Sequence, residues 1–195
     1  MITNAQLRQT FVSPAMKFYF DRKLAPLPGT EVDARVEELL KYLNMSLFSH
    51  GGIPVSEDID DVWHLWIMQT KEYALLCRRL QGGKFIHHSS NEYEAYADAD
   101  VRDRPIDIHR VVALLASYVL NYGPFQASRL RYWPVAEQVT QRLGWSVEQL
   151  NEWLTSRNAS GAAHGAVAAS QQASRQAGLA ALPRGAGRER AGQSA

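Results

Sequence analysis

Cysteine is nearly absent from this chain, and so is any long run of apolar residues. Cys77 is the only cysteine among 195 residues, so no disulfide can form within the chain. The most apolar stretch, VVALLASYVL at residues 111–120, is about half as long as a membrane-spanning helix requires. The N-terminal residues do not have a positively charged segment followed by an apolar one. These absences predict a cytoplasmic protein without a membrane-spanning segment.

An excess of charge of one sign is also lacking. The chain has 21 basic and 20 acidic side chains, a net charge of +1. Four arginines and one glutamate follow residue 157, a net of +3, so the first 157 residues carry a net of −2. A mildly acidic body is a poor surface for the phosphate backbone of nucleic acids. The charge therefore disfavours nucleic acid as a partner and leaves a small molecule or another protein.

Standard catalytic and nucleotide-binding motifs are missing as well. The chain has no GxGxxG or GxxxxGK[ST] loop, no HExxH, no CxxC pair and no GxSxG. The motifs therefore indicate no reaction. Candidate sites are indicated only by single residues and their spacing.

Large hydrophobic residues become scarce after residue 157. Residues 158–195 are dominated by alanine, glycine, serine and glutamine and contain no aromatic residue. Such a segment buries too little apolar surface to offset the backbone entropy of ordering, about 1 to 2 kcal/mol per residue. The composition predicts a folded domain over residues 1–157 and a disordered tail over residues 158–195.

Within the first 157 residues the hydrophobic pattern is helical. Apolar residues recur at steps of three and four over residues 30–47, 56–80 and 107–122, with a break expected near Thr70. Gln149 is placed to complete a capping box at the start of the last helix. The expected helix starts are Thr30, Ser56, Asp107, Pro134 and Ser146. No segment shows the sustained alternation of a strand. The sequence predicts an all-α fold, a single irregular domain of about five or six helices.

Residues 59–88 concentrate the side chains that carry chemistry: two of the five tryptophans, three of the six histidines and the only cysteine. Asp60 and His64 are four residues apart on a predicted helix, so their side chains share a face and can meet. A carboxylate bonded to one imidazole nitrogen fixes the tautomer and leaves the other nitrogen for a proton or a metal ion. Asp60 and His64 are therefore the candidate catalytic residues.

A metal site is the related hypothesis. Cys77 follows His64 by 13 residues, and His87 and His88 come after a turn at residues 82–83. His64, Cys77 and either His87 or His88 would supply three ligands that suit zinc or iron with one open coordination position. The spacing does not match a standard zinc signature.

The same residues also have a structural interpretation. Trp63, Trp66 and Cys77 fall on apolar helical stripes, which is typical of core residues. His64 would then be a hydrogen-bonded, half-buried histidine, and at least one of the two later histidines would face solvent.

A second group of residues, RLRYWP at residues 129–134, places two arginines beside two aromatic residues. The arginines are Arg129 and Arg131, and the aromatic residues are Tyr132 and Trp133. This group would line a pocket or partner surface, bind an anion or nucleic acid, or anchor a loop through buried rings. The sequence favours the buried anchor.

Residues 53–90 resemble the signature segment of the glycine-rich-domain-containing-protein-like family, which is named from plant members. The matching residues, in order, are Asp60, Trp63, His64, Tyr73, Cys77, Gly83 and His88. Trp66 stands where the family pattern Trp-His-x-His has its second histidine, so the resemblance implies a remodelled or lost site unless His87 replaces it. The glycine-rich region of the plant members is absent. The family has no assigned reaction, and the resemblance implies only that His64, Cys77 and His88 act together.

Two functions follow from these observations. The first is a mononuclear His/Cys metal site, with zinc or iron, in a metal-dependent enzyme of unknown substrate. The alternative is a non-catalytic protein–protein interaction module in which the Trp/His/Cys cluster is structural.

Overall fold

The computed structural model describes residues 1–46, 55–80, 82–88 and 108–156, and every regular element in these ranges is a helix. The elements are α1 (Asn4–Phe11), α2 (Pro14–Lys23), α3 (Gly29–Ser46), α4 (Glu57–Met68), α5 (Thr70–Arg79), α7 (Ile108–Tyr122), the 3₁₀ helix η1 (Ala127–Tyr132), α8 (Pro134–Leu143) and α9 (Val147–Thr155). The predicted all-α fold is confirmed. The predicted tail, residues 158–195, and the expected helix start at Asp107 lie outside the described residues.

The described part contains more helices than the five or six predicted, because the N-terminal region adds two short ones and the 3₁₀ helix η1 precedes α8. Thr3 accepts a hydrogen bond from the Gln6 amide and the Gln6 side chain bonds back to Thr3, a capping box that starts α1. The Ser13 side chain accepts from the Met16 amide and starts α2. The expected break near Thr70 also separates α4 from α5.

The helix starts agree with the sequence at some positions and differ at others. Ser146 and Gln149 form the predicted capping box of α9. The prediction of Thr30 as an N-cap is wrong, because the Pro28 carbonyl already accepts from the amides at positions 31 and 32 and α3 begins at Gly29. Ser56 occupies the N-cap of α4, but its side chain makes no cap hydrogen bond.

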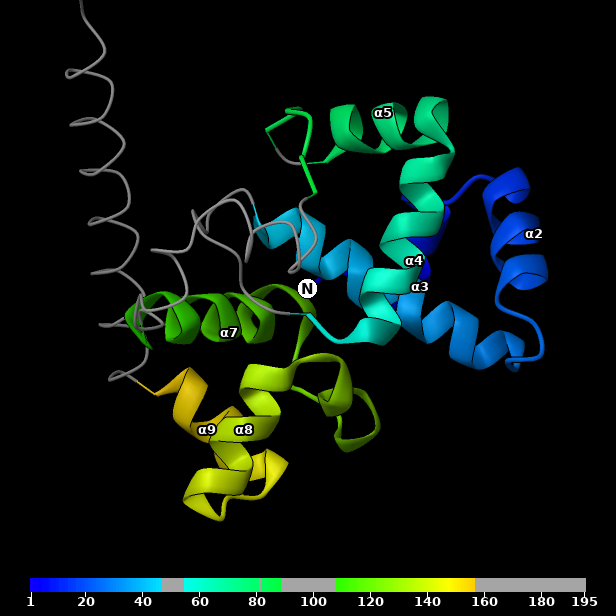
Figure 1. Cartoon of the computed structure of the whole chain (residues 1–195). Helices are drawn as coiled ribbons and strands as arrows, with labels where there is room; N and C mark the ends of the chain where they lie inside the picture. The colour runs from blue at the N-terminus through cyan, green and yellow to red at the C-terminus, as the bar shows by residue number, and fades with distance from the viewer. Residues whose placement is uncertain (47–54, 81, 89–107, 157–195) are drawn as a thin grey trace, which may run out of the picture.

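Helix α3 is the element around which the others are arranged. It contacts α1, α2, α4, α7 and η1. Figure 1 shows α4 crossing α3, with α2 beside them, while α7, α8 and α9 gather at the other end of the molecule. Leu39, Leu40 and Leu43 of α3 are fully buried. Burial of the apolar face of this helix organises the core.

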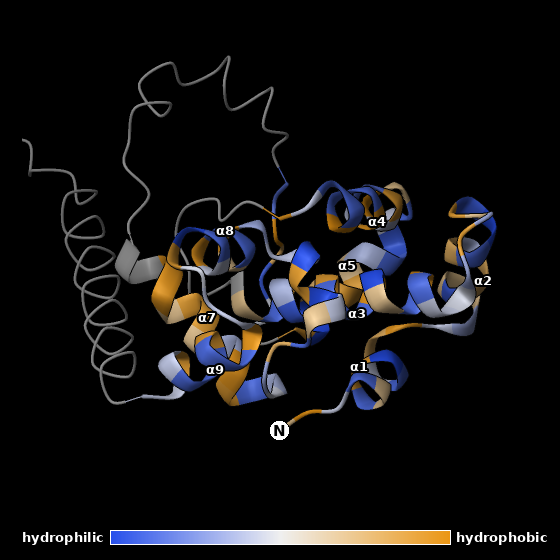
Figure 2. Ribbon diagram, turned by 90° about the horizontal axis from the view of Figure 1, so that it is seen from below, coloured by the Kyte–Doolittle hydropathy of each residue, from blue (hydrophilic) through white to orange (hydrophobic). Residues whose placement is uncertain are grey.

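The aromatic residues of α4 lie in the core, as the structural interpretation predicted for them. Trp63 and Trp66 are buried, and the Trp66 ring meets the Phe20 ring of α2 edge to face, with 5.2 Å between centroids. Hydrophobic and hydrophilic residues alternate around helices such as α3 (Figure 2). No helix in the described ranges is long and apolar enough to cross a membrane.

Candidate metal site

Helix α4 presents Asp60 and His64 at the edge of its apolar stripe, toward solvent. Ile59, Val62 and Trp66 are essentially without solvent exposure and hold the helix against the core. The side chains of Asp60 and His64 are 37% and 50% exposed to solvent. The i, i+4 spacing predicted from the sequence therefore places a carboxylate and an imidazole side by side at the surface.

Asp60 contacts His64 through two of its oxygens. The Nδ1 atom of His64 lies 3.0 Å from the Asp60 backbone carbonyl oxygen and 3.3 Å from its Oδ2 atom. In the tautomer with the proton on Nδ1, His64 donates to these oxygens, and Nε2 keeps its lone pair.

His88 reaches the same carboxylate from a separate segment of the chain. Gly82 and Gly83 have φ angles of 91° and 60°, in the left-handed region that favours glycine, and turn the chain after α5. The Nε2 atom of His88 lies 2.7 Å from Oδ1 of Asp60. The His88 side chain is only 9% exposed, so this contact is more sheltered than that of His64.

Aromatic contacts fix the orientation of the His88 ring. The ring meets the Trp63 ring nearly perpendicularly, at 87° with 4.3 Å between centroids. The His64 ring lies on another side, at 4.5 Å between centroids. Trp63 thus contributes to the core and also positions a site residue.

A hydrogen-bond relay through Tyr73 of α5 holds the segment that carries His88. The indole nitrogen of Trp63 donates to the Tyr73 hydroxyl at 3.0 Å, and that hydroxyl donates to the Ile86 carbonyl at 2.6 Å. Burial raises the pKa of Tyr73 far above its usual value, so the phenol stays protonated and remains a donor. The relay ties α4, α5 and the 82–88 segment together two residues before His88.

Asp60, His64 and His88 each offer one ligand atom, and these three atoms lie within 4.8 Å of one another. Two ligands on one metal ion, with bonds of about 2.0 to 2.1 Å, are separated by about 2.9 to 3.4 Å. Small side-chain movements would therefore bring all three atoms to bonding distance. The arrangement has the composition of a two-histidine, one-carboxylate site.

The other predicted ligands do not join this group in the described part of the chain. Cys77 is buried on α5 beside Tyr73, whose pKa its thiol helps to raise. His87 is exposed, and its ring packs against the exposed Phe85 ring, with 5.0 Å between centroids. Of the sequence-based candidates, the structure brings together Asp60, His64 and His88.

Sequence reasoning missed the direct bond between Asp60 and His88 and the relay through Tyr73. The sequence pairs Asp60 with His64, and spacing along the chain contains no signal for a partner 28 residues away. The family pattern does contain Tyr73, but without a role. A second omission is the group of charged residues on the buried side of α3, Glu37, Glu38 and Lys41.

No family model, no curated protein and no solved structure matches this chain. The resemblance of residues 53–90 to the glycine-rich-domain-containing-protein-like family stays a prediction that rests on the seven matching residues.

Proposed function

We propose that this protein binds one divalent transition-metal ion through Asp60, His64 and His88. The observation that carries the proposal is the convergence of three ligand atoms within 4.8 Å from two separate segments of the chain. Imidazole nitrogens with a carboxylate oxygen suit zinc and iron(II).

The surroundings of the three residues support a site with an open coordination position. Trp63 covers one side of His88, whereas Asp60 and His64 remain partly exposed. Three protein ligands leave room for water or a substrate, and a bound metal ion would supply Lewis-acid activation of that molecule. The proposal is therefore a metal-dependent enzyme in the cytoplasm, with a substrate of unknown class.

Metal content and titration calorimetry of the purified full chain test the proposal. We expect one zinc or iron(II) ion per wild-type chain, and loss of this ion in His64→Ala and in His88→Ala. His87→Ala is the matched control, because it removes the neighbouring, exposed histidine and should keep the full metal content. A wild-type chain that binds neither ion would contradict the proposal and favour the interaction module, in which the cluster only holds residues 82–88 against α4.

A Cys77→Ala variant separates this ligand set from the one that the sequence suggested. Cys77 is buried beside Tyr73, so we expect a small loss of stability and an unchanged metal content. Loss of the metal ion from a variant that remains folded would instead make Cys77 a ligand.

A further inference from the structure

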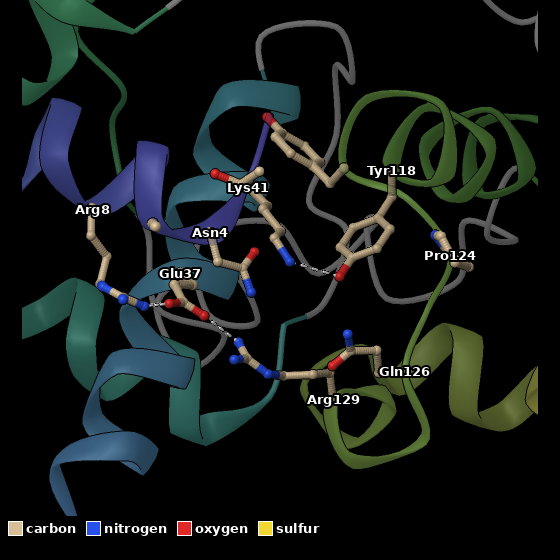
Figure 3. A pocket seen from close by; sticks show the side chains of 11 residues that line it. Asn4, Arg8, Glu37, Lys41, Tyr118, Pro124, Gln126 and Arg129 are labelled. Carbon is tan, nitrogen blue, oxygen red and sulfur yellow. Dashed lines mark hydrogen bonds and ion pairs between the residues drawn. The ribbon is translucent and has the colours of Figure 1, made fainter. Parts of the chain in front are cut away.

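A second, separate feature is a polar cavity on the side of α3 that faces α1 and α7. Its volume is about 510 Å³. Figure 3 shows the side chains that surround it. Polar side chains in its lining include Asn4, Arg8, Glu37, Lys41, Tyr118 and Arg129. They come from α1, α3, α7 and η1, so the cavity exists only in the folded chain.

The cations at this cavity are held in fixed positions by buried partners. The Lys41 ammonium, nearly without exposure, donates to Glu38 at 2.8 Å and to the Tyr118 hydroxyl at 3.0 Å. Arg129 lies 2.7 Å from Glu37 and 3.2 Å from Glu38. Positive groups that are already positioned at a cavity need little reorganisation to receive a ligand.

Three cations and one carboxylate line the cavity, and two further carboxylates, Asp33 beside Arg8 and Glu38 beside Lys41 and Arg129, lie outside the lining. Arg8, Lys41 and Arg129 face one lining carboxylate, that of Glu37, which forms an ion pair with Arg8 as well as with Arg129. Burial lowers the pKa of Lys41, and the charge and hydrogen bond of Glu38 oppose this shift. Glu38 itself is fully buried and does not line the cavity.

The first turn of α1 also contributes positive character to the cavity. Thr3, Asn4 and Ala5 line the cavity, and the turn contains no acidic side chain to offset the helix dipole. The capping box satisfies the amides of Thr3 and Gln6. The amides of Asn4 and Ala5 are among the first of the helix, which have no partner within it. Such amides bind anions readily.

We propose that this cavity binds a small anionic molecule that carries a carboxylate or a phosphate group. Its oxyanion would lie between Arg129, Lys41 and the start of α1. Glu37 provides an acceptor, which suits a hydroxyl group next to the anion. The volume lies within the range of about 300 to 1,000 Å³ that is typical of small-molecule sites. Arg129 belongs to the RLRYWP group, for which anion binding was one of the interpretations of the sequence.

Titration calorimetry of the full chain with two pairs of probes tests the proposal and separates the two sources of the anion. The phosphate probes are inorganic phosphate and glycerol 3-phosphate, and the carboxylate probes are malate and citrate. We expect one pair to bind with a Kd below about 1 mM. Absence of binding by all four probes would overturn the proposal.

An Asn4→Asp variant locates the binding in this cavity. The new carboxylate repels an anion there, and we expect affinity to fall at least about tenfold. An acidic residue in the first turn of a helix is favourable, so α1 should remain folded. Gln6→Glu is the matched control, because it adds the same charge to the same turn and keeps the capping-box geometry, but it does not line the cavity. Equal affinity in wild type and Asn4→Asp would also overturn the proposal.

Discussion

The Tyr73 hydroxyl illustrates how a single atom determines the geometry of the candidate metal site. It accepts from the Trp63 indole and donates to the Ile86 carbonyl, so it connects α4 to the segment that carries His88. The Trp63 indole N–H and the Ile86 carbonyl are polar groups in a largely apolar region. A donor or acceptor left unpaired there lowers the free energy of unfolding by about 1 to 3 kcal/mol.

Tyr73→Phe tests this role. We expect a loss of about 1 to 3 kcal/mol in the free energy of unfolding. Metal affinity should also fall, because the segment that carries His88 loses its anchor. Urea denaturation and zinc titration measure the two effects. Tyr19→Phe, on α2 and outside the Asp60–His64–His88 cluster, is the control and should leave zinc affinity unchanged. Full zinc affinity in Tyr73→Phe would show that the relay does not position His88.

Glu31 is a residue whose charge state links stability to pH. Burial by itself raises its pKa, but the hydrogen bonds from Arg35 and Tyr132, together with the charge of Arg131, outweigh this and lower the pKa below 4.5. At a pH between the lowered pKa of the folded chain and the ordinary pKa of the unfolded chain, Glu31 is therefore mostly ionised in the folded chain and mostly protonated in the unfolded chain.

Stability should consequently fall as the pH is lowered through the depressed pKa of Glu31, and the contribution should be fully present at neutral pH. Thermal melts between about pH 7 and pH 3 measure the profile. Glu31→Gln should be less stable at neutral pH and show a flatter acid branch. Parallel acid branches in the two proteins would contradict this assignment.

At the scale of the helix, two serines at equivalent positions behave differently. Ser146 begins α9 with a side chain that accepts from the Gln149 amide, and Gln149 bonds back. Ser56 precedes α4, but its hydroxyl is buried and has no hydrogen-bond partner among the residues that the structure describes. Both residues have extended backbone angles, so the difference lies in the side chain alone.

Ser146→Ala should therefore cost about 1 kcal/mol of stability, as is typical for loss of an N-cap. Ser56→Ala should cost nothing, because it removes an unsatisfied hydroxyl from a buried position. Urea denaturation of the two variants provides the comparison, and each serves as the other's control. A larger loss at Ser56 would mean that its hydroxyl does cap α4 in solution.

At the scale of the whole molecule, Glu38 joins three parts of the fold. Its carboxylate, fully buried on α3, accepts from Lys41, from Tyr118 of α7 and from Trp133 after η1. Tyr132 and Trp133 of RLRYWP are buried, which confirms the prediction that these rings act as buried anchors. The Tyr118 and Trp133 rings also meet edge to face, at 5.1 Å between centroids.

Glu38→Gln should strongly destabilise the protein, by about 3 to 5 kcal/mol, because it leaves the buried charge of Lys41 without its counterion. Glu72→Gln is the control. Glu72 is half buried and, within the described part of the chain, accepts one long bond of 3.3 Å from Ser13, so its loss should cost less than about 1 kcal/mol. Urea denaturation distinguishes the two, and similar losses would show that the cluster around Glu38 is not a structural junction.

The sequence by itself was sufficient for the features that depend on neighbouring residues. Helical periodicity predicted α3, α4 and α7, the Ser146 capping box predicted α9, and the i, i+4 spacing predicted that Asp60 meets His64. These features follow from local hydrogen bonds and from the side on which apolar residues lie, and both are visible along the chain.

Only the tertiary structure decided which distant residues meet. The arrival of His88 at Asp60 depends on the turn at Gly83 and on the Tyr73 relay, and neither spacing nor composition determines where such a turn directs the chain. The charged residues of α3 likewise acquire their partners from α1, α7 and η1. Packing between helices sets these distances, and for that reason Cys77 belongs to the core while His88 belongs to the candidate site.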